Sequence, residues 1–140
     1  MPAEATLNVD ARVESLAAVR AFVERACRLT GLDPASCFDL KLAVDEACAN
    51  IIDHGYQGRA GGAIRIGCSS DESSVRVTIV DWGRAFAPAE LPPADVTSDW
   101  KQRPVGGLGW HLIQQSVDEI DYEPDPAAGN RLTLVKRSRK

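Results

Sequence analysis

The chain has 140 residues, of which 44% are hydrophobic and 26% charged, and its formal net charge is −4. This length favours one domain spanning residues 1–140, and the composition is ordinary for a soluble globular protein. The negative charge gives no footprint for direct nucleic-acid binding, and no run approaches the roughly 20 apolar residues of a membrane span. The N-terminal residues carry no basic stretch and no apolar run, so no secretory signal is predicted.

Two features bear on the location of the protein and on its end. None of the four cysteines stands two residues from another, which argues against a zinc site and favours reduced thiols in a cytoplasmic protein. The basic residues 136–140 are interpreted as a solvated, frayed terminus, because a short charged end buries too little surface to order itself.

The first half of the chain predicts a short strand and then two helices. The strand is expected over residues 6–10. Apolar residues recur at helical spacing over residues 13–29, and Gly31 supplies a C-terminal stop. Asp33 and Pro34 then begin a second helix as N-cap and first-turn residue, and this helix is expected to run to about His54.

The second half predicts two strand pairs separated by a loop and a helix. Residues 63–68 and 75–80 alternate between apolar and polar, as in a hairpin. Residues 87–104 hold four prolines and no period, which indicates a long loop of the kind that often serves as a lid. A helix over 108–117 and strands over 120–122 and 131–135 follow. This order predicts an α+β, two-layer sandwich with helices on one face of a mixed, mostly antiparallel sheet.

The second predicted helix carries two polar side chains that suit nucleotide chemistry. Glu46 and Asn50 are spaced i, i+4, which places both on one side of the helix. An amide oxygen near a helix end is a suitable ligand for Mg²⁺, and a carboxylate one turn earlier can deprotonate a hydroxyl beside a terminal phosphate. The alternative interpretation is a polar, solvated helix face.

The strand predicted over residues 75–80 runs into Asp81-Trp82-Gly83. A carboxylate at the end of a strand can accept a hydrogen bond from the exocyclic amine of adenine. Gly83, without a side chain, would let the backbone pass close to the base. The alternative is an Asp-x-Gly turn, which is common after strands.

Gly106-Gly107-Leu108-Gly109 precedes the third predicted helix. Backbone N–H groups of such a loop, together with the helix N-terminus, can hold phosphate oxygens. The segment lacks the Gly-Lys-Ser/Thr ending of a Walker A loop. Arg103, in the predicted lid, is a candidate for contact with the terminal phosphate. The alternatives are a flexible hinge and a solvated loop charge.

Together and in this order, the three segments resemble the ATP-binding boxes of the gyrase/Hsp90/histidine kinase/MutL superfamily, whose architecture is called the Bergerat fold. The matching residues are Glu46 and Asn50 (N box), Asp81 and Gly83 (G1 box), and Gly107 and Gly109 (G2 box). Residues 42–56, 107–113 and 129–134 are further similar to the RsbW/SpoIIAB-type anti-sigma-factor serine kinases, so the resemblance extends over nearly the whole chain.

The resemblance implies a protein serine/threonine kinase that uses ATP and Mg²⁺. Such proteins phosphorylate a STAS-domain anti-anti-sigma protein, bind and block a sigma factor, and often form a homodimer. The roles implied are a catalytic base (Glu46), a Mg²⁺ ligand (Asn50), an adenine contact (Asp81), pocket-shaping residues (Gly83, Gly107, Leu108 and Gly109), an adenine-edge contact (Thr133) and a partner-surface residue (Arg20).

The chain departs from the family pattern at two positions. Val105 stands where the family commonly has a lid arginine, and Arg103 is the nearest candidate; Ala87 stands where an aspartate is frequent. Two alternatives therefore remain open. One is a nucleotide-dependent binding module that sequesters a partner without phosphotransfer, and the other is a kinase of this fold whose target serves a pathway other than transcription.

Overall fold

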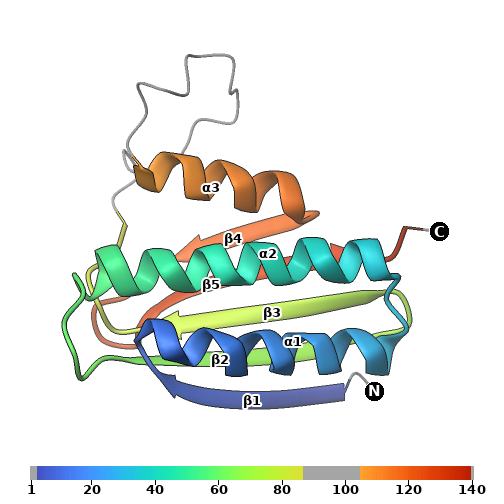
Figure 1. Cartoon of the computed structure of the whole chain (residues 1–140), viewed down its shortest axis with the longest axis horizontal. Coiled ribbons are helices and arrows are strands. Elements are labelled where there is room, and N and C mark those ends of the chain that lie inside the picture. The colour runs from blue at the N-terminus through green and yellow to red at the C-terminus, as the bar shows by residue number, and fades with distance from the viewer. Residues whose placement is uncertain (1–2, 87–104, 140) are drawn as a thin grey trace.

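In the described part of the chain, three α-helices cover one face of a five-stranded sheet (Figure 1). The computed structural model describes residues 3–86 and 105–139. In chain order the elements are β1 (Ala3–Asp10), the 3₁₀ helix η1 (Val13–Ser15), α1 (Leu16–Thr30), α2 (Pro34–Asn50), the π-helical segment η2 (Ile51–Gly55), β2 (Ala63–Ser70), β3 (Ser74–Asp81), α3 (Val105–Ser116), β4 (Glu119–Glu123) and β5 (Asn130–Arg137). The predicted α+β sandwich is confirmed, while the loop predicted over 87–104 lies outside the described residues.

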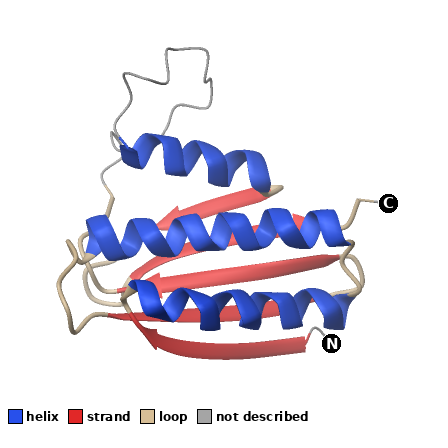
Figure 2. Cartoon of the chain, viewed as in Figure 1, coloured by secondary structure: helices blue, strands red, loops and turns tan. Residues whose placement is uncertain are grey.

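The strand order in the sheet is β1-β2-β3-β5-β4, and each neighbouring pair is antiparallel. The expected mixed sheet is therefore corrected to an antiparallel one in the described part of the chain. The reason is the position of β5, which is inserted between β3 and β4 (Figure 2). Because β3 and β4 are both antiparallel to β5, they run in the same direction without pairing with each other.

The core lies between the sheet and the helices. Alternate residues of β2 and β3 face it, as the period of two in these segments predicts. Its most completely buried apolar side chains are Val19, Val23, Leu40, Val44, Ile64, Ile66, Val75, Val77, Ile79, Ile113 and Leu134. All four cysteines are buried and free, and burial raises the pKa of Cys48 and of Cys68 to about 12, which makes these thiols poor nucleophiles.

The local signals that separate α1 from α2 act as predicted. Gly31 ends α1 in the left-handed conformation, with φ of 75°. Asp33 caps α2 by accepting a hydrogen bond from the backbone N–H of Ser36 at 3.1 Å. No helix in the described ranges is long and apolar enough to cross a membrane.

The basic C-terminal segment is docked, so the expectation of a frayed terminus is wrong for residues 136–139. Lys136 is 3% exposed and lies 3.4 Å from the Asp39 carboxylate. The backbone N–H of Arg139 donates to Asp33 at 2.8 Å, and its guanidinium donates to Asp39 at 2.7 Å. The N-terminal end of α2 thus supplies two carboxylates that hold the segment, Asp33 at the N-cap and Asp39 in the second turn. The Arg139 amide keeps the pKa of Asp33 well below its usual range.

Candidate functional site

The ends of four helices and strands meet at one end of the sandwich. The C-terminal end of α2 with η2, the end of β3, the start of β5 and the N-terminal end of α3 all lie at the left edge of Figure 1. Three of the predicted segments are carried by these ends: Glu46 and Asn50 on α2, Asp81 on β3, and the glycines on α3. The fold therefore brings together segments that lie far apart in the sequence, from Glu46 to Gly109.

On α2, Asn50 and Glu46 differ in their surroundings. Asn50 is 8% exposed, and its side-chain nitrogen has no hydrogen-bond partner among the described residues. A buried amide group without a partner costs about 1–3 kcal/mol, so such a group is typical of a site that a ligand completes. Glu46 is partly exposed, and the described residues give its carboxylate no hydrogen bond or ion pair. Within the described part of the chain, the Glu46 carboxylate is thus unpaired.

Arg20 on α1 pairs with Asp45, the residue before Glu46. Its Nε atom donates to the Asp45 carboxylate at 2.8 Å. Both side chains are substantially exposed, so this pair contributes at most about 1 kcal/mol to stability. The structure therefore places the predicted partner-surface residue beside the helix face that carries Glu46.

The π-helical segment after Asn50 brings the backbone of Gly55 against Gly83. The backbone N–H of Tyr56 donates to the Ile51 carbonyl, five residues back, and the N–H of Arg84 donates to the Gly55 carbonyl at 2.7 Å. A Cβ atom on Gly83 would lie 2.5 Å from that carbonyl oxygen. The backbone of Gly55 thus requires a glycine at position 83, and the predicted approach of Gly83 to a base stays a prediction.

Asp81 is 3% exposed, and its hydrogen bonds fall on one carboxylate oxygen. The Oδ1 atom accepts from the Gly83 N–H at 2.9 Å and from the Asn130 amide at 3.3 Å. Among the described residues, Oδ2 receives no hydrogen bond, so it is available to accept one from a ligand. Burial raises the pKa of Asp81, and the bonds from Gly83 and Asn130 offset this only in part.

Asn130, at the start of β5, is the site residue that sequence analysis did not select. It is 4% exposed, and its amide nitrogen donates both to Asp81 and to the Gly83 carbonyl, at 3.3 and 3.0 Å. The sequence signal that could have indicated Asn130 is its position directly after Gly129, a turn glycine that has a φ of 100° in the structure. Asn130 therefore links the start of β5 to the carboxylate at the end of β3.

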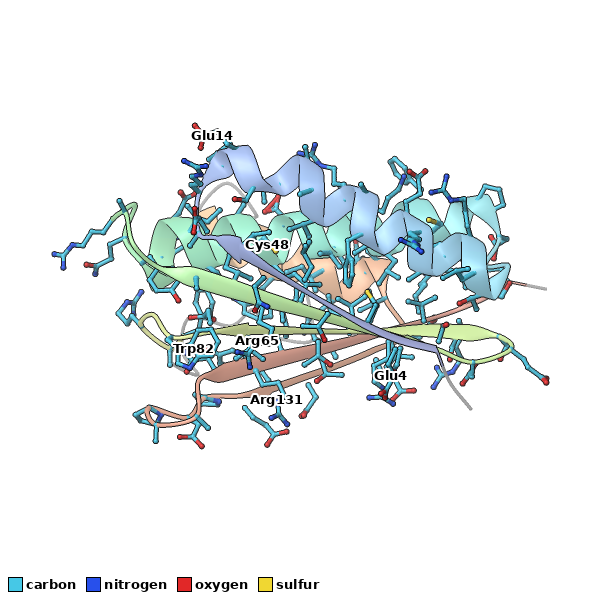
Figure 3. All side chains as sticks on the ribbon, turned by 90° about the horizontal axis from the view of Figure 1, so that it is seen from below. Glu4, Glu14, Cys48, Arg65, Trp82 and Arg131 are labelled. Carbon is cyan, nitrogen blue, oxygen red and sulfur yellow. The ribbon has the colours of Figure 1, made fainter. Side chains whose placement is uncertain are left out.

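Thr133, in contrast, is not brought to this site. It pairs with Thr78 on β5 and β3, while its neighbours Leu132 and Leu134 face the core. Thr133 lines an open hollow on the other face of the sheet together with Arg65 and Arg131. Figure 3 shows Arg65 and Arg131 pointing away from the helices.

The glycine-rich segment forms the first turn of α3, which begins at Val105. The predicted helix start at Leu108 is therefore corrected to Val105, and Gly106, Gly107, Leu108 and Gly109 lie within the helix. The first four N–H groups of an α-helix have no partner within the helix, and the positive end of the helix dipole lies there. The segment thus keeps its anion-binding donors as a helix terminus. Arg103 lies outside the described residues.

An aromatic cluster fixes α3 against β4 and against the segment that follows β3. The Phe86 ring contacts those of Trp110 and Tyr122 edge-on, with centroids 5.3 and 6.0 Å apart. The backbone N–H of Phe86 donates to the Tyr122 hydroxyl at 3.1 Å. Edge-to-face pairs of this kind contribute about 0.5–1.5 kcal/mol each beyond burial, so the cluster holds Trp110 of α3 against Phe86 and Tyr122.

The described residues contain no cluster of three or more His, Cys, Asp or Glu side chains that could hold a metal ion. Mg²⁺ does not need such a cluster, because it is commonly bound through one or two protein oxygens together with substrate phosphates. The buried Asn50 amide can bind in this mode through its oxygen, since its unpaired nitrogen is a hydrogen-bond donor and not a ligand for Mg²⁺. Among the described residues, the donor set is therefore compatible with a magnesium–phosphate ligand.

Comparisons of the sequence with known proteins agree on one family. Residues 9–136 match the histidine kinase-like ATPase domain. The chain is 28% identical to the serine-protein kinase RsbW of Halalkalibacterium halodurans over 139 residues, which is 96% of this chain and 83% of that protein. It is 29% identical to RsbW of Listeria monocytogenes over 119 residues, 82% and 76% of the two chains. It is 28% identical to the anti-sigma F factor of Clostridium beijerinckii over 122 residues, 86% and 81%.

One solved structure has the same fold. It contains the RsbU and RsbW domains of Rv1364c from Mycobacterium tuberculosis, and the match has a TM-score of 0.65 at 20% sequence identity. The match covers 96% of this chain and 32% of that longer one, so this chain spans about a third of that protein. The likeness supports the assignment of the fold.

Proposed function

The chain belongs to the family of histidine kinase-like ATPase domains, and from that premise we propose that it is an ATP-dependent protein serine/threonine kinase of the anti-sigma type. The observation that carries the proposal is the meeting of Glu46 and Asn50, Asp81 and the α3 N-terminus at one end of the sandwich. Three of these groups suit the parts of a bound nucleotide: a buried carboxylate for the adenine, an amide for the metal ion and backbone N–H donors for the phosphates. The fourth, Glu46, is a base for the hydroxyl that receives the phosphate.

In this proposal each part of the site acts on a different part of ATP. The free Oδ2 of Asp81 accepts a hydrogen bond from the adenine amine, while Gly83 and Asn130 hold the other oxygen. The free N–H groups of the first turn of α3, which include those of Gly107 and Leu108, hold phosphate oxygens, and Gly109 shapes the pocket. Asn50 holds Mg²⁺, which neutralises charge on the phosphates when it is bound.

Glu46 is proposed as the general base. Its carboxylate makes no bond to a described residue and lies one helical turn before Asn50. It is therefore placed to accept the proton of a serine or threonine hydroxyl that attacks the terminal phosphate in line. Arg103 is a candidate for stabilising that phosphate, and Thr133 is dropped from the adenine contacts because it lies on the other face of the sheet.

The partners follow from the relatives' names and from the family resemblance. We propose that the protein phosphorylates a STAS-domain anti-anti-sigma protein, sequesters a sigma factor in the cytoplasm, and can form a homodimer. Arg20 is proposed to lie on the partner surface, where its pair with Asp45 sits beside Glu46. A bound partner would thus present its hydroxyl next to the base.

The test is transfer of radiolabel from γ-labelled ATP to a STAS partner, with Glu46→Gln as the variant. The substitution removes the base and keeps the size of the side chain, so ATP binding should be retained. General base catalysis is typically a factor of about 10²–10⁴, so phosphotransfer should fall by at least about tenfold. Near-normal transfer by Glu46→Gln would exclude Glu46 as the base. No transfer by the wild-type protein, with normal ATP binding, would favour the module that sequesters without phosphorylating.

A further inference from the structure

The hydroxyl of Tyr56 joins two strands at the point where their pairing ends. The last β2–β3 pair is Ile64 with Asp81, so Trp82 lies one residue beyond the ladder. The backbone N–H of Trp82 donates to the Tyr56 hydroxyl at 2.8 Å, and that hydroxyl donates to the Ala63 carbonyl at 2.7 Å. The phenol therefore replaces the missing backbone partner and uses both its acceptor and its donor capacity.

The ring of Tyr56 lies in a slot between two glycines. A Cβ atom on Gly62 would come within 2.6 Å of the ring, and a Cβ on Gly83 would come within 3.1 Å of it. Both neighbours thus need to lack a side chain for the ring to occupy this place. The ring and the hydroxyl together fix Tyr56 against the turn that contains Trp82 and Gly83.

This turn is the one that orients Asp81. The Gly83 N–H donates to Asp81 Oδ1 at 2.9 Å, and the next residue, Arg84, is held by the Gly55 carbonyl at 2.7 Å. Gly55 immediately precedes Tyr56, so one short segment holds the turn at two points. The position of Oδ2 depends on this turn, because the carboxylate is held through Oδ1.

We infer that Tyr56 is a positioning residue for recognition of the adenine base, acting through the Trp82–Gly83 turn on Asp81. The inference rests on the proposed adenine contact of Asp81. Guanine carries a carbonyl at the place of the adenine amine, so a well-placed carboxylate accepts from ATP and repels GTP. Tyr56 therefore sets the preference for ATP over GTP and does not touch the phosphates.

The experiment is calorimetric titration of the full chain with ATP, and with GTP as a competitor, for wild type and Tyr56→Phe. Phenylalanine keeps the ring in its slot and removes only the two hydrogen bonds. Such bonds are worth about 0.5–1.5 kcal/mol, so the ratio of ATP to GTP affinity should fall about threefold to tenfold. Thr30→Val, which removes a hydroxyl bonded to Ala26 at 2.9 Å on α1, is the matched control and should leave the ratio unchanged.

A second variant, Gly62→Ala, places a methyl group against the ring and should lower the same ratio in a protein that keeps its hydroxyl. An unchanged ratio in Tyr56→Phe, or equal losses for ATP and GTP, would overturn the role of Tyr56, since a merely structural defect weakens both nucleotides alike. A wild-type protein that binds no ATP would overturn the proposed function and this inference together. Normal wild-type binding with an unchanged Tyr56→Phe would overturn this inference alone.

Discussion

Substitution of Gly83 by alanine should damage both the stability of the fold and the binding of nucleotide. The added Cβ would lie 2.5 Å from the carbonyl oxygen of Gly55 and 2.6 Å from its carbonyl carbon, against about 3.5 Å for an ordinary contact. Both neighbours are backbone atoms, so relief requires the turn or the π-helical segment to shift. Overpacking of this kind costs about 1–3 kcal/mol.

The same shift strains the hydrogen bond from the Arg84 N–H to the Gly55 carbonyl, which is worth about 1 kcal/mol. The expected total is therefore about 2–4 kcal/mol of the free energy of unfolding. For a domain of this size that corresponds to a melting temperature lower by roughly 8–15 °C. Because Gly83 also donates to Asp81, ATP affinity should fall by at least about tenfold under conditions where the variant is folded.

Gly67→Ala is the matched control, since Gly67 lies within β2 and a Cβ there has its nearest atoms at 4.0 Å. This variant should be neutral or slightly more stable, by about 0.5 kcal/mol, because alanine loses less conformational freedom than glycine on folding. Thermal and urea denaturation measure the stability, and calorimetry measures ATP binding. If both variants melt within about 2 °C of the wild type, the close approach of Gly55 and Gly83 does not constrain the fold, and the reasoning is refuted.

Three further results are expected at the site and at the chain end. Burial raises the pKa of Asp81, so ATP binding should weaken on acidification at a higher pH than the titration of a free aspartate would give. The Asp81→Asn variant should not bind ATP. A profile of ATP binding that is flat down to about pH 4 would contradict this prediction. Asn130→Ala should lower the free energy of unfolding, measured by urea denaturation, by about 1–3 kcal/mol, because it removes the donor to the Gly83 carbonyl. It should also raise the pKa of Asp81 further, because it removes the donor to that carboxylate. Unchanged stability and an unchanged pH profile of ATP binding would count against the role of Asn130 as the link between β5 and Asp81. The pKa of Asp33 is lowered in the folded protein, so its carboxylate stabilises the fold above the unfolded pKa of about 3.9, and this stabilisation is lost as the pH falls through the folded pKa. Asp33→Asn should therefore be less stable than the wild type at pH 7 and equally stable in strong acid. A difference in stability that does not depend on pH would exclude the carboxylate as the cause.

Much of the fold could be predicted because its signals are local. Asp33 and Pro34 at a helix start, Gly31 at a helix end and the alternation in residues 63–68 and 75–80 depend only on neighbours along the chain. The conformational preferences of these residues and the period of a helix or strand determine the element whatever it packs against. The pairing of Glu46 with Asn50 on one helix face follows from the same periodicity.

The tertiary structure decided what depends on contacts between distant segments. The docking of Arg139 on Asp33 and the approach of Gly55 to Gly83 join residues that no local preference connects, so neither was predicted. The fold also assigned Asn130 to the site and Thr133 to the opposite face, because β5 is inserted between β3 and β4 in one register. By itself the sequence determined the elements and the residues suited to a nucleotide, since both are properties of side chains and their spacing. Which of those residues meet was decided by packing, since burying the apolar faces of sheet and helices together is what places the ends of α2, β3, β5 and α3 side by side.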